Sequence, residues 1–204
     1  MLSQPNARAV QSSAPSQTGT RVHAYPRGNV TFLFSDIQGS TRRWEHDPAA
    51  MQVVVERHFD LLRGAIETHG GVLFKTIGDA VQAAFPATPP AVAAALAGQR
   101  AVASADWGDD GRIWVRMGLH SGPATPGDGD YHALCLNCLA RLLPAGYGGQ
   151  ILLLHAVAET VRQSLPLRPA PPCATWANIA CAISSRTSTS TSSTHPTWRA
   201  VSRR

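Results

Sequence analysis

The chain has 204 residues, of which 44% are hydrophobic, and this is enough for one domain with a core plus flanking segments. No apolar run approaches the roughly 18 residues that cross a bilayer, so we expect no membrane segment. The net charge is +5, but residues 1–165 carry thirteen basic and thirteen acidic side chains. The whole excess comes from five arginines after residue 165, in a tail without a recognition motif, so we expect no nucleic-acid partner.

The first 27 residues are rich in Ser, Gln, Pro and Ala and contain no acidic residue. They lack the apolar stretch of a signal peptide, and a transit peptide is the alternative to the simpler interpretation. We therefore expect residues 1–27 to form a disordered leader.

Strand and helix patterns then follow in a regular order. Residues 29–35 alternate apolar and polar side chains, which is typical of a strand. Asp47 and Pro48 can cap and open a helix, which Gly70 can close. Further on, the patterns predict strands at 72–77 and 80–85 joined by a tight turn, an Ala-rich helix at 88–105, a strand at 112–120, a helix at 132–143, a strand at 150–154 and a helix ending near 165.

The first six elements come in the order βαββαβ, and α, β and α follow. This order is typical of the α+β class with a ferredoxin-like core, an antiparallel sheet with helices on one face. We expect the first strand to lie beside the second, so that the loops after both strands share one edge. Because this fold carries many functions, the function of residues 28–165 has to come from the site.

Two carboxylates stand where predicted strands end. Asp36 ends the first strand, and the chain turns through Gly39 into a helical start at Ser40 and Thr41. Free N–H groups at such a start, with the helix dipole, favour a polyphosphate. Asp79 lies at the tip of the hairpin, and two carboxylates beside phosphate donors suit Mg²⁺. The alternative is that Asp36 caps a helix and Asp79 fills a turn.

Four segments in this order resemble the catalytic domain of the class III adenylate/guanylate cyclases. They are VTFLFSDIQGST at 30–41, FKTIGDA at 74–80, RMGLHSG at 116–122, and Asp130 followed by Asn137 and Arg141. The resemblance covers residues 28–165. It implies conversion of ATP or GTP into a 3′,5′-cyclic monophosphate and pyrophosphate by two-metal phosphoryl transfer, with two Mg²⁺ ions, or Mn²⁺ in their place. We expect ATP and cyclic AMP, because Lys75 and Asp130 suit adenine.

The resemblance also assigns roles to single residues. Asp36 and Asp79 match the two metal-binding aspartates, and Lys75 and Asp130 fall where the family reads the purine. Asn137 and Arg141 match the pair that acts in the transition state. In the family the metal aspartates and the base-reading pair come from opposite subunits, so the resemblance implies a homodimer with composite sites.

The chemistry of these side chains agrees with the implied roles. Lys75 has donors only and Asp130 acceptors only, which complements the N1 acceptor and the amino donor of adenine, whereas guanine presents the opposite pattern. Asn137 and Arg141 stand four apart and share one helix face, where arginine can stabilise phosphate charge and asparagine can orient the ribose. The alternatives are a strand lysine in solvent and two polar residues facing water.

The chain departs from the family pattern at two places. Ala133 stands where glycine is usual, and Cys138 and Leu139 stand where small residues are common. After residue 165 the chain is rich in Pro, Ser and Thr. DNA that encodes the family's hairpin sequence LRDLGEHRL can be read one base later as CATWANIAC, which is residues 173–181 here. We therefore expect 166–204 to be a frameshifted, non-native tail that leaves a sheet edge unpaired and the chain as written with little activity.

Two other functions remain open at this stage. One is a catalytically inactive dimerisation or nucleotide-binding module, which the lost hairpin favours. The other is a diguanylate-cyclase-like enzyme, against which the Lys75/Asp130 pair and the absence of its signature turn argue. Cys135 and Cys138 have no second pair at metal-site spacing, so we interpret them as core residues of a reduced, cytoplasmic protein.

Overall fold

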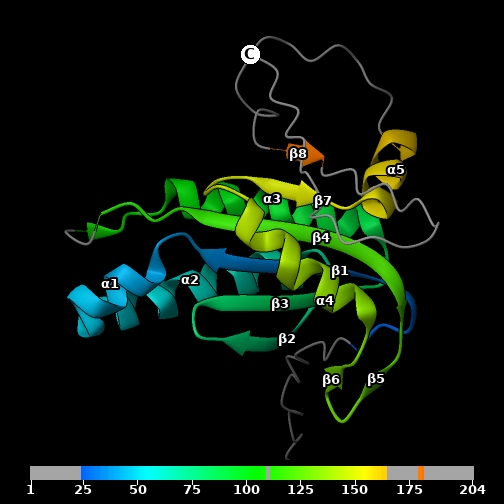
Figure 1. Ribbon diagram of the computed structural model, residues 1–204, viewed down its shortest axis with the longest axis horizontal. Helices are drawn as coiled ribbons and strands as arrows, with labels where there is room; N and C mark the ends of the chain where they lie inside the picture. The colour runs from blue at the N-terminus through cyan, green and yellow to red at the C-terminus, as the bar shows by residue number, and fades with distance from the viewer. Residues whose placement is uncertain (1–23, 109–110, 165–178, 182–204) are drawn as a thin grey trace, which may run out of the picture.

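The computed structural model describes residues 24–108, 111–164 and 179–181, which form a mixed sheet with helices on both faces (Figure 1). The main sheet has six strands. In spatial order they are β2 (Val72–Ile77), β3 (Ala80–Phe85), β1 (Gly28–Ile37), β4 (Val115–Ala124), β7 (Ile151–Leu153) and β8 (Ile179–Cys181). A separate two-stranded sheet joins β5 (Pro126–Gly127) and β6 (Asp130–Tyr131).

The first four strands in this spatial order pair antiparallel, whereas β7 and β8 add in parallel. The predicted α+β class is therefore confirmed, but the expected neighbour of the first strand is wrong. β3 lies between β1 and β2. β1 and β2 both run antiparallel to β3, so they are parallel to each other. Parallel strands need a long crossover, which the helical connection supplies, whereas β2 and β3 are joined by the tight turn at Gly78 and Asp79. Asp79 is on that turn, so it still lies near the end of β1.

Three helices cover one face of the sheet. They are α2 (Pro48–Thr68), α3 (Thr88–Ser104) and α5 (His155–Ser164), and their apolar side chains form one core with inward residues of the strands. The predicted cap of α2 is confirmed, since the Asp47 side chain accepts a hydrogen bond from the Ala50 N–H and Pro48 occupies the first turn. The short helix α1 (Ser40–His46) precedes it.

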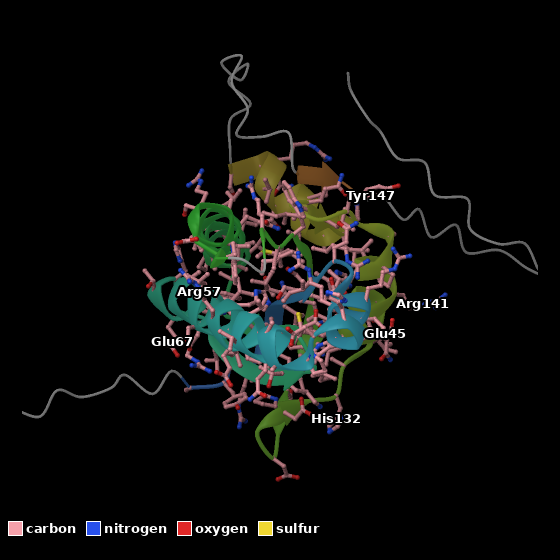
Figure 2. The ribbon with its side chains drawn as sticks, turned by 90° about the vertical axis from the view of Figure 1, so that its left-hand side faces the viewer. Glu45, Arg57, Glu67, His132, Arg141 and Tyr147 are labelled. Atoms are coloured by element: carbon pink, nitrogen blue, oxygen red, sulfur yellow. The ribbon has the colours of Figure 1, made fainter. Side chains whose placement is uncertain are left out.

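The opposite face is covered too, and this corrects the expectation of helices on one face only. α4 (Leu134–Leu142) and η2 (Leu143–Ala145) pack there in a second apolar cluster. Side chains of β1 are buried continuously from Val30 to Ser35, which fits a strand covered on both faces. Figure 2 shows Arg57 and Glu67 of α2 on one side of the molecule and Arg141 of α4 on the other.

Two glycines of β4 let α4 lie close to the sheet. A Cβ at Gly118 would lie 3.3 Å from a methyl carbon of Leu139, and one at Gly122 would lie 3.4 Å from the Cβ of Cys135. The C-terminal part of α4 therefore lies over Gly118 and its first turn over Gly122. Consequently α4 runs back along β4 toward the end of the sheet that carries Asp36.

Most of both flanking segments lies outside the described residues, so the expectations of a disordered leader and a frameshifted tail stay predictions. Two details are visible. Tyr25 and Pro26, within the expected leader, contact Tyr131. The expectation that the tail leaves β7 as an unpaired edge is wrong, because β8 pairs with it from Ile151 to Leu153 through backbone hydrogen bonds, which do not depend on the side-chain sequence. None of the helices in the described part of the chain is long and apolar enough to span a membrane.

Candidate active site

Asp36 and Asp79 meet at one end of the sheet. Asp36 is the penultimate residue of β1, and the next residue, Ile37, donates its backbone N–H to Oδ2 of Asp79 over 2.7 Å. This bond ties the β2–β3 turn to the end of β1. The Asp79 carboxylate therefore lies beside the residue that follows Asp36, at the same end of the sheet.

Arg116 completes this end of the sheet, and the sequence analysis did not single it out. It lies directly opposite Asp36 in the β1–β4 ladder. Its Nε and one terminal nitrogen donate to the two carboxylate oxygens of Asp36 over 2.7 and 2.6 Å. The only available signal was that the 116–122 motif begins with an arginine, and the strand register that places it opposite Asp36 could not be read from the motif.

The two carboxylates can provide part of a magnesium site. No cluster of three or more His, Cys, Asp or Glu side chains with metal-site geometry occurs within the described residues. Mg²⁺ commonly takes one or two carboxylates from a protein and completes its octahedron with water and substrate phosphates, so the residues present fit this ion. Binding at Asp36 would compete with the Arg116 guanidinium, because both cations use the same oxygens.

The predicted phosphate loop lies next to these carboxylates in the chain. Gly39 adopts the left-handed conformation with φ of 75°, and α1 begins at Ser40 without a side-chain cap and without an acidic residue in its first turn. The N-cap residue therefore offers no side-chain acceptor to the first N–H groups of α1. Gln38 fixes the loop to the neighbouring strand connection, since its backbone N–H donates to the Trp114 carbonyl over 2.8 Å and its side-chain oxygen accepts from the Gly148 N–H.

Lys75 and Asp130 form an ion pair, so the structure brings the predicted base-reading residues together. The Lys75 hydrogen bond holds the pKa of the Asp130 carboxyl below its usual range, and the Tyr131 N–H, which donates to the same carboxylate over 2.7 Å, adds to the effect. The side chains of Lys75 and Asp130 are 42% and 27% exposed, so both remain within reach of a ligand.

A β-bulge in β2 places Lys75 on the side of the sheet that α4 covers. Leu73 pairs with Ala83, but Lys75 pairs with Gln82, so Phe74 is an extra residue in β2. Gln82 also lies opposite Phe34, which belongs to the cluster under α4. Without the bulge, alternation would turn Lys75 toward α2 and α3 and away from Asp130.

Asn137 and Arg141 lie on the exposed side of α4, while Cys135, Leu139 and Leu142 face the sheet. The expected shared face is therefore present, and Figure 2 shows Arg141 at the outer surface. Asp36, by contrast, shares the face of the sheet that α4 covers, since it stands two residues after Phe34 on the same strand. Asn137 and Arg141 thus point away from the sheet that holds the two aspartates.

Known proteins resemble the chain over this same region. The model of the family described as "Adenylate and Guanylate cyclase catalytic domain" matches residues 22–132, more than half of the chain. The chain belongs to this family. An adenylate cyclase of Lachancea kluyveri is 34% identical over 155 residues, which cover 64% of this chain and 8% of that protein. An uncharacterized protein of Mycobacterium tuberculosis is 34% identical over 143 residues, covering 69% of this chain and 48% of that protein.

Solved structures agree on the fold of the cyclase domain. Adenylate cyclases from Trypanosoma brucei, studied in their monomeric state, match with a TM-score of 0.62 at 24% identity, over 66% of this chain and 77% of theirs. The present chain spans only 8% of the length of the Lachancea adenylate cyclase and about half of the length of the mycobacterial relative.

The departures from the family pattern within the domain lie in α4 and at the residue that precedes it. Ala133 is the residue before the helix, in an extended conformation with φ of −140°, so its Cβ causes no backbone strain. Leu139 is fully buried against Gly118. Cys135 is buried as expected, and burial raises the pKa of its thiol, whereas Cys138 is exposed and the core interpretation is wrong for it. The reason is helical spacing, because a residue three positions after Cys135 has already turned toward the exposed side.

His58 of α2 is a buried polar residue of the domain. It is fully buried, and neither ring nitrogen has a hydrogen-bond partner among the described residues. Burial lowers the pKa of His58 to about 4, although the charge of nearby Asp79 and the closeness of its backbone, which falls short of hydrogen-bond geometry, work in the opposite direction. The imidazole is therefore neutral at pH 7.

This histidine predicts a pH-dependent stability of the metal-free protein. The unfolded chain takes up the proton at its ordinary pKa near 6.5, before the folded chain does, so the free energy of unfolding falls as the pH drops from 7 toward 4. The loss amounts to roughly 3 kcal/mol at most. Replacement by leucine, which removes two unpartnered buried nitrogens, should leave stability at pH 7 equal or higher and remove this part of the slope.

Urea unfolding in EDTA at pH 7.0 and 4.5 measures the effect. His46→Gln, on the exposed side of α1, is the matched control and should keep the wild-type slope. If His58→Leu and the wild type lose the same stability between the two pH values, the neutral buried imidazole is not the cause.

Proposed function

We propose that the domain converts ATP into 3′,5′-cyclic AMP and pyrophosphate, at sites formed between two copies of the chain. The observation that carries this proposal is the ion pair between Lys75 of the main sheet and Asp130 of the small sheet, in a domain that holds Asp36 and Asp79 at one end of the main sheet. Family membership supports the reaction class, and the chemistry of the pair supports ATP as the substrate.

Adenine fits the pair better than guanine does. The Lys75 ammonium can donate to N1, and the Asp130 carboxylate can accept from the amino group. Guanine would place its N1–H against the ammonium and its carbonyl oxygen against the carboxylate. Each such mismatch leaves a polar group without a partner.

The remaining residues have roles at the phosphates and the ribose. Asp36 and Asp79 would hold the divalent ions, which when bound activate the 3′-hydroxyl as a nucleophile and neutralise the pyrophosphate. The N–H groups at Gly39, Ser40 and Thr41 would contact the phosphates. Arg116 would be available to the phosphate chain if a metal ion took its place at Asp36.

The orientation of α4 supports a dimer with composite sites. Asn137 and Arg141 point outward, away from the sheet that carries Asp36. Leu134, at the start of α4, is 83% exposed, and Ile77, on the β2–β3 hairpin, is 56% exposed. A second subunit would cover these apolar side chains and bring the outward face of α4 to the opposite pair of aspartates.

The proposal concerns residues 28–165, and the effect of the tail on activity is tested separately. Activity is therefore measured on the 204-residue chain and on a version whose reading frame is restored after residue 165. We expect the restored chain to be the more active form, because the resemblance implies a phosphate-contacting lysine in the family hairpin, and Lys75 is the only lysine in the present sequence. We refer to whichever of these two forms has the higher turnover as the active form.

Substrate preference tests the proposal. The active form should use ATP with a kcat/KM at least about tenfold above that for GTP, which corresponds to one unsatisfied polar group. Changing Lys75→Glu together with Asp130→Asn supplies an acceptor and a donor for guanine and should move the ratio toward GTP. A ratio that stays the same in the double variant would show that this pair does not read the base.

The alternative is a nucleotide-binding module without turnover. The bidentate Arg116–Asp36 pair favours it, because it occupies a proposed metal ligand. Such a module would bind ATP in a competition assay yet release neither cyclic AMP nor pyrophosphate, with either form of the chain.

A further inference from the structure

Backbone pairing does not fix Lys75 relative to Asp130. Lys75 lies in β2, at the edge of the main sheet, and Asp130 lies in β6, which pairs only with β5 within the described residues. Their ion pair is partly exposed, and such a pair contributes little on its own. Another interaction must therefore keep the two side chains at a fixed distance.

The neighbours of the two residues form that interaction. Phe74, next to Lys75, and Tyr131, next to Asp130, meet edge to face with ring centroids 5.0 Å apart. Phe32 of β1 packs against both, with its centroid 5.0 Å from that of Tyr131 and 6.0 Å from that of Phe74. Three mutual edge-to-face contacts hold their rings in defined directions. We refer to Phe32, Phe74 and Tyr131 as the ring cluster.

The ring cluster is anchored on both sides. Phe32 is fully buried in the central strand, and Phe74 is the bulge residue that turns Lys75 toward Asp130. Tyr131 is only 2% exposed, and its hydroxyl donates to the Pro26 carbonyl over 2.8 Å. The cluster thus connects β2 and β1 of the main sheet to the small sheet, with which the main sheet shares no hydrogen-bond ladder within the described residues.

We propose that the ring cluster is the positioning device for Lys75 and Asp130 and that it sets the preference of the site for adenine. The part of this inference that concerns adenine preference rests on the proposed function. Hydrogen bonds to a purine edge need donor and acceptor held to within a fraction of an ångström. If a ring were removed from the cluster, Lys75 and Asp130 would no longer be held at a fixed separation. The affinity for ATP would then fall more than the affinity for GTP, which fits the pair poorly from the start.

The first test needs no catalytic activity. Lys75 is the only lysine in the chain, so an acetylating ester at limiting concentration reports on Lys75, with the amino terminus as internal reference. Asp130→Asn should raise the rate of acetylation by about two- to fivefold, the change expected for loss of an exposed ion pair. Phe74→Leu should give a similar rise in the 204-residue chain.

Phe85→Leu is the matched control. It removes a fully buried ring from the opposite face of the same sheet and costs stability without touching the ring cluster. Its acetylation rate should match that of the wild type. Tyr131→Phe keeps the ring and loses only the bond to Pro26, so it should lie between the wild type and Phe74→Leu. If Phe74→Leu does not fold, Phe74→Met also removes the ring, and its flexible, unbranched side chain can fill the space in a different way.

The second test measures kcat/KM for ATP and GTP in the active form. Phe74→Leu should lower the ATP-to-GTP ratio at least about threefold, mainly through the KM for ATP, while Phe85→Leu keeps the ratio. The positioning role is overturned if Asp130→Asn raises acetylation and Phe74→Leu does not, or if the ratio is unchanged. If no form makes a cyclic nucleotide, the proposed function fails, and acetylation alone still decides whether the cluster holds the pair.

Discussion

Asp79→Asn is expected to abolish measurable cyclisation of ATP while leaving the fold intact. The amide keeps an oxygen that can accept the Ile37 N–H, so the turn between β2 and β3 stays attached to β1. What the substitution removes is the negative charge proposed to hold a divalent ion. Metal activation contributes several kcal/mol to such a barrier, so we expect kcat to fall by at least about a hundredfold.

Asp60→Asn is the matched control, because Asp60 is an exposed residue of α2 whose carboxylate pairs with Arg63. It should keep wild-type turnover, and both variants should keep the melting temperature within a few degrees. Near-normal Mg²⁺-dependent turnover by Asp79→Asn would remove Asp79 from the metal site.

Mixing two inactive variants should restore activity if the sites are composite. Asp79→Asn and Arg141→Ala belong to opposite halves of a proposed site, so a mixed dimer places both lesions in one site and leaves the other intact. At equal mixing, random pairing gives roughly a quarter of the wild-type activity. The measurement is ATP turnover after incubation of the two purified variants, with exchange of subunits checked by differently tagged chains.

The control mixture is Asp79→Asn with Asp36→Asn, which affects the same half of the site twice. Each site of that mixed dimer then carries one lesion, so no recovery is expected. No recovery in the test mixture despite exchange would indicate sites contained within one subunit, and recovery in the control would show that Asp36 and Asp79 do not belong to the same half of a site.

Local signals in the sequence predicted the parts of the fold that local interactions determine. The turn at Gly78 and Asp79 gave the β2–β3 hairpin with its observed bounds, and Asp47 with Pro48 gave the start of α2. Helical spacing placed Asn137 and Arg141 on one side of α4. These features depend on a few consecutive residues and on the fixed period of helix or strand.

Features that depend on the partner of a segment were missed. The position of β3 between β1 and β2, and the packing of α4 on the second face, follow from long-range pairing. The pairing of Arg116 with Asp36 follows from the β1–β4 register. The bulge at Phe74 leaves no mark in the alternation of a six-residue strand, yet it decides the face on which Lys75 lies.

The most direct test of the central claim is to incubate ATP with the purified protein and Mg²⁺ and to quantify cyclic AMP and pyrophosphate. Both the 204-residue chain and the frame-restored chain are assayed, with Mn²⁺ as a second metal and EDTA as the blank. The account predicts equal amounts of the two products, made by at least the frame-restored form, and none in EDTA or with Asp79→Asn. A folded protein that makes no cyclic AMP in either form with either metal, or that makes it equally well in EDTA, would contradict the account.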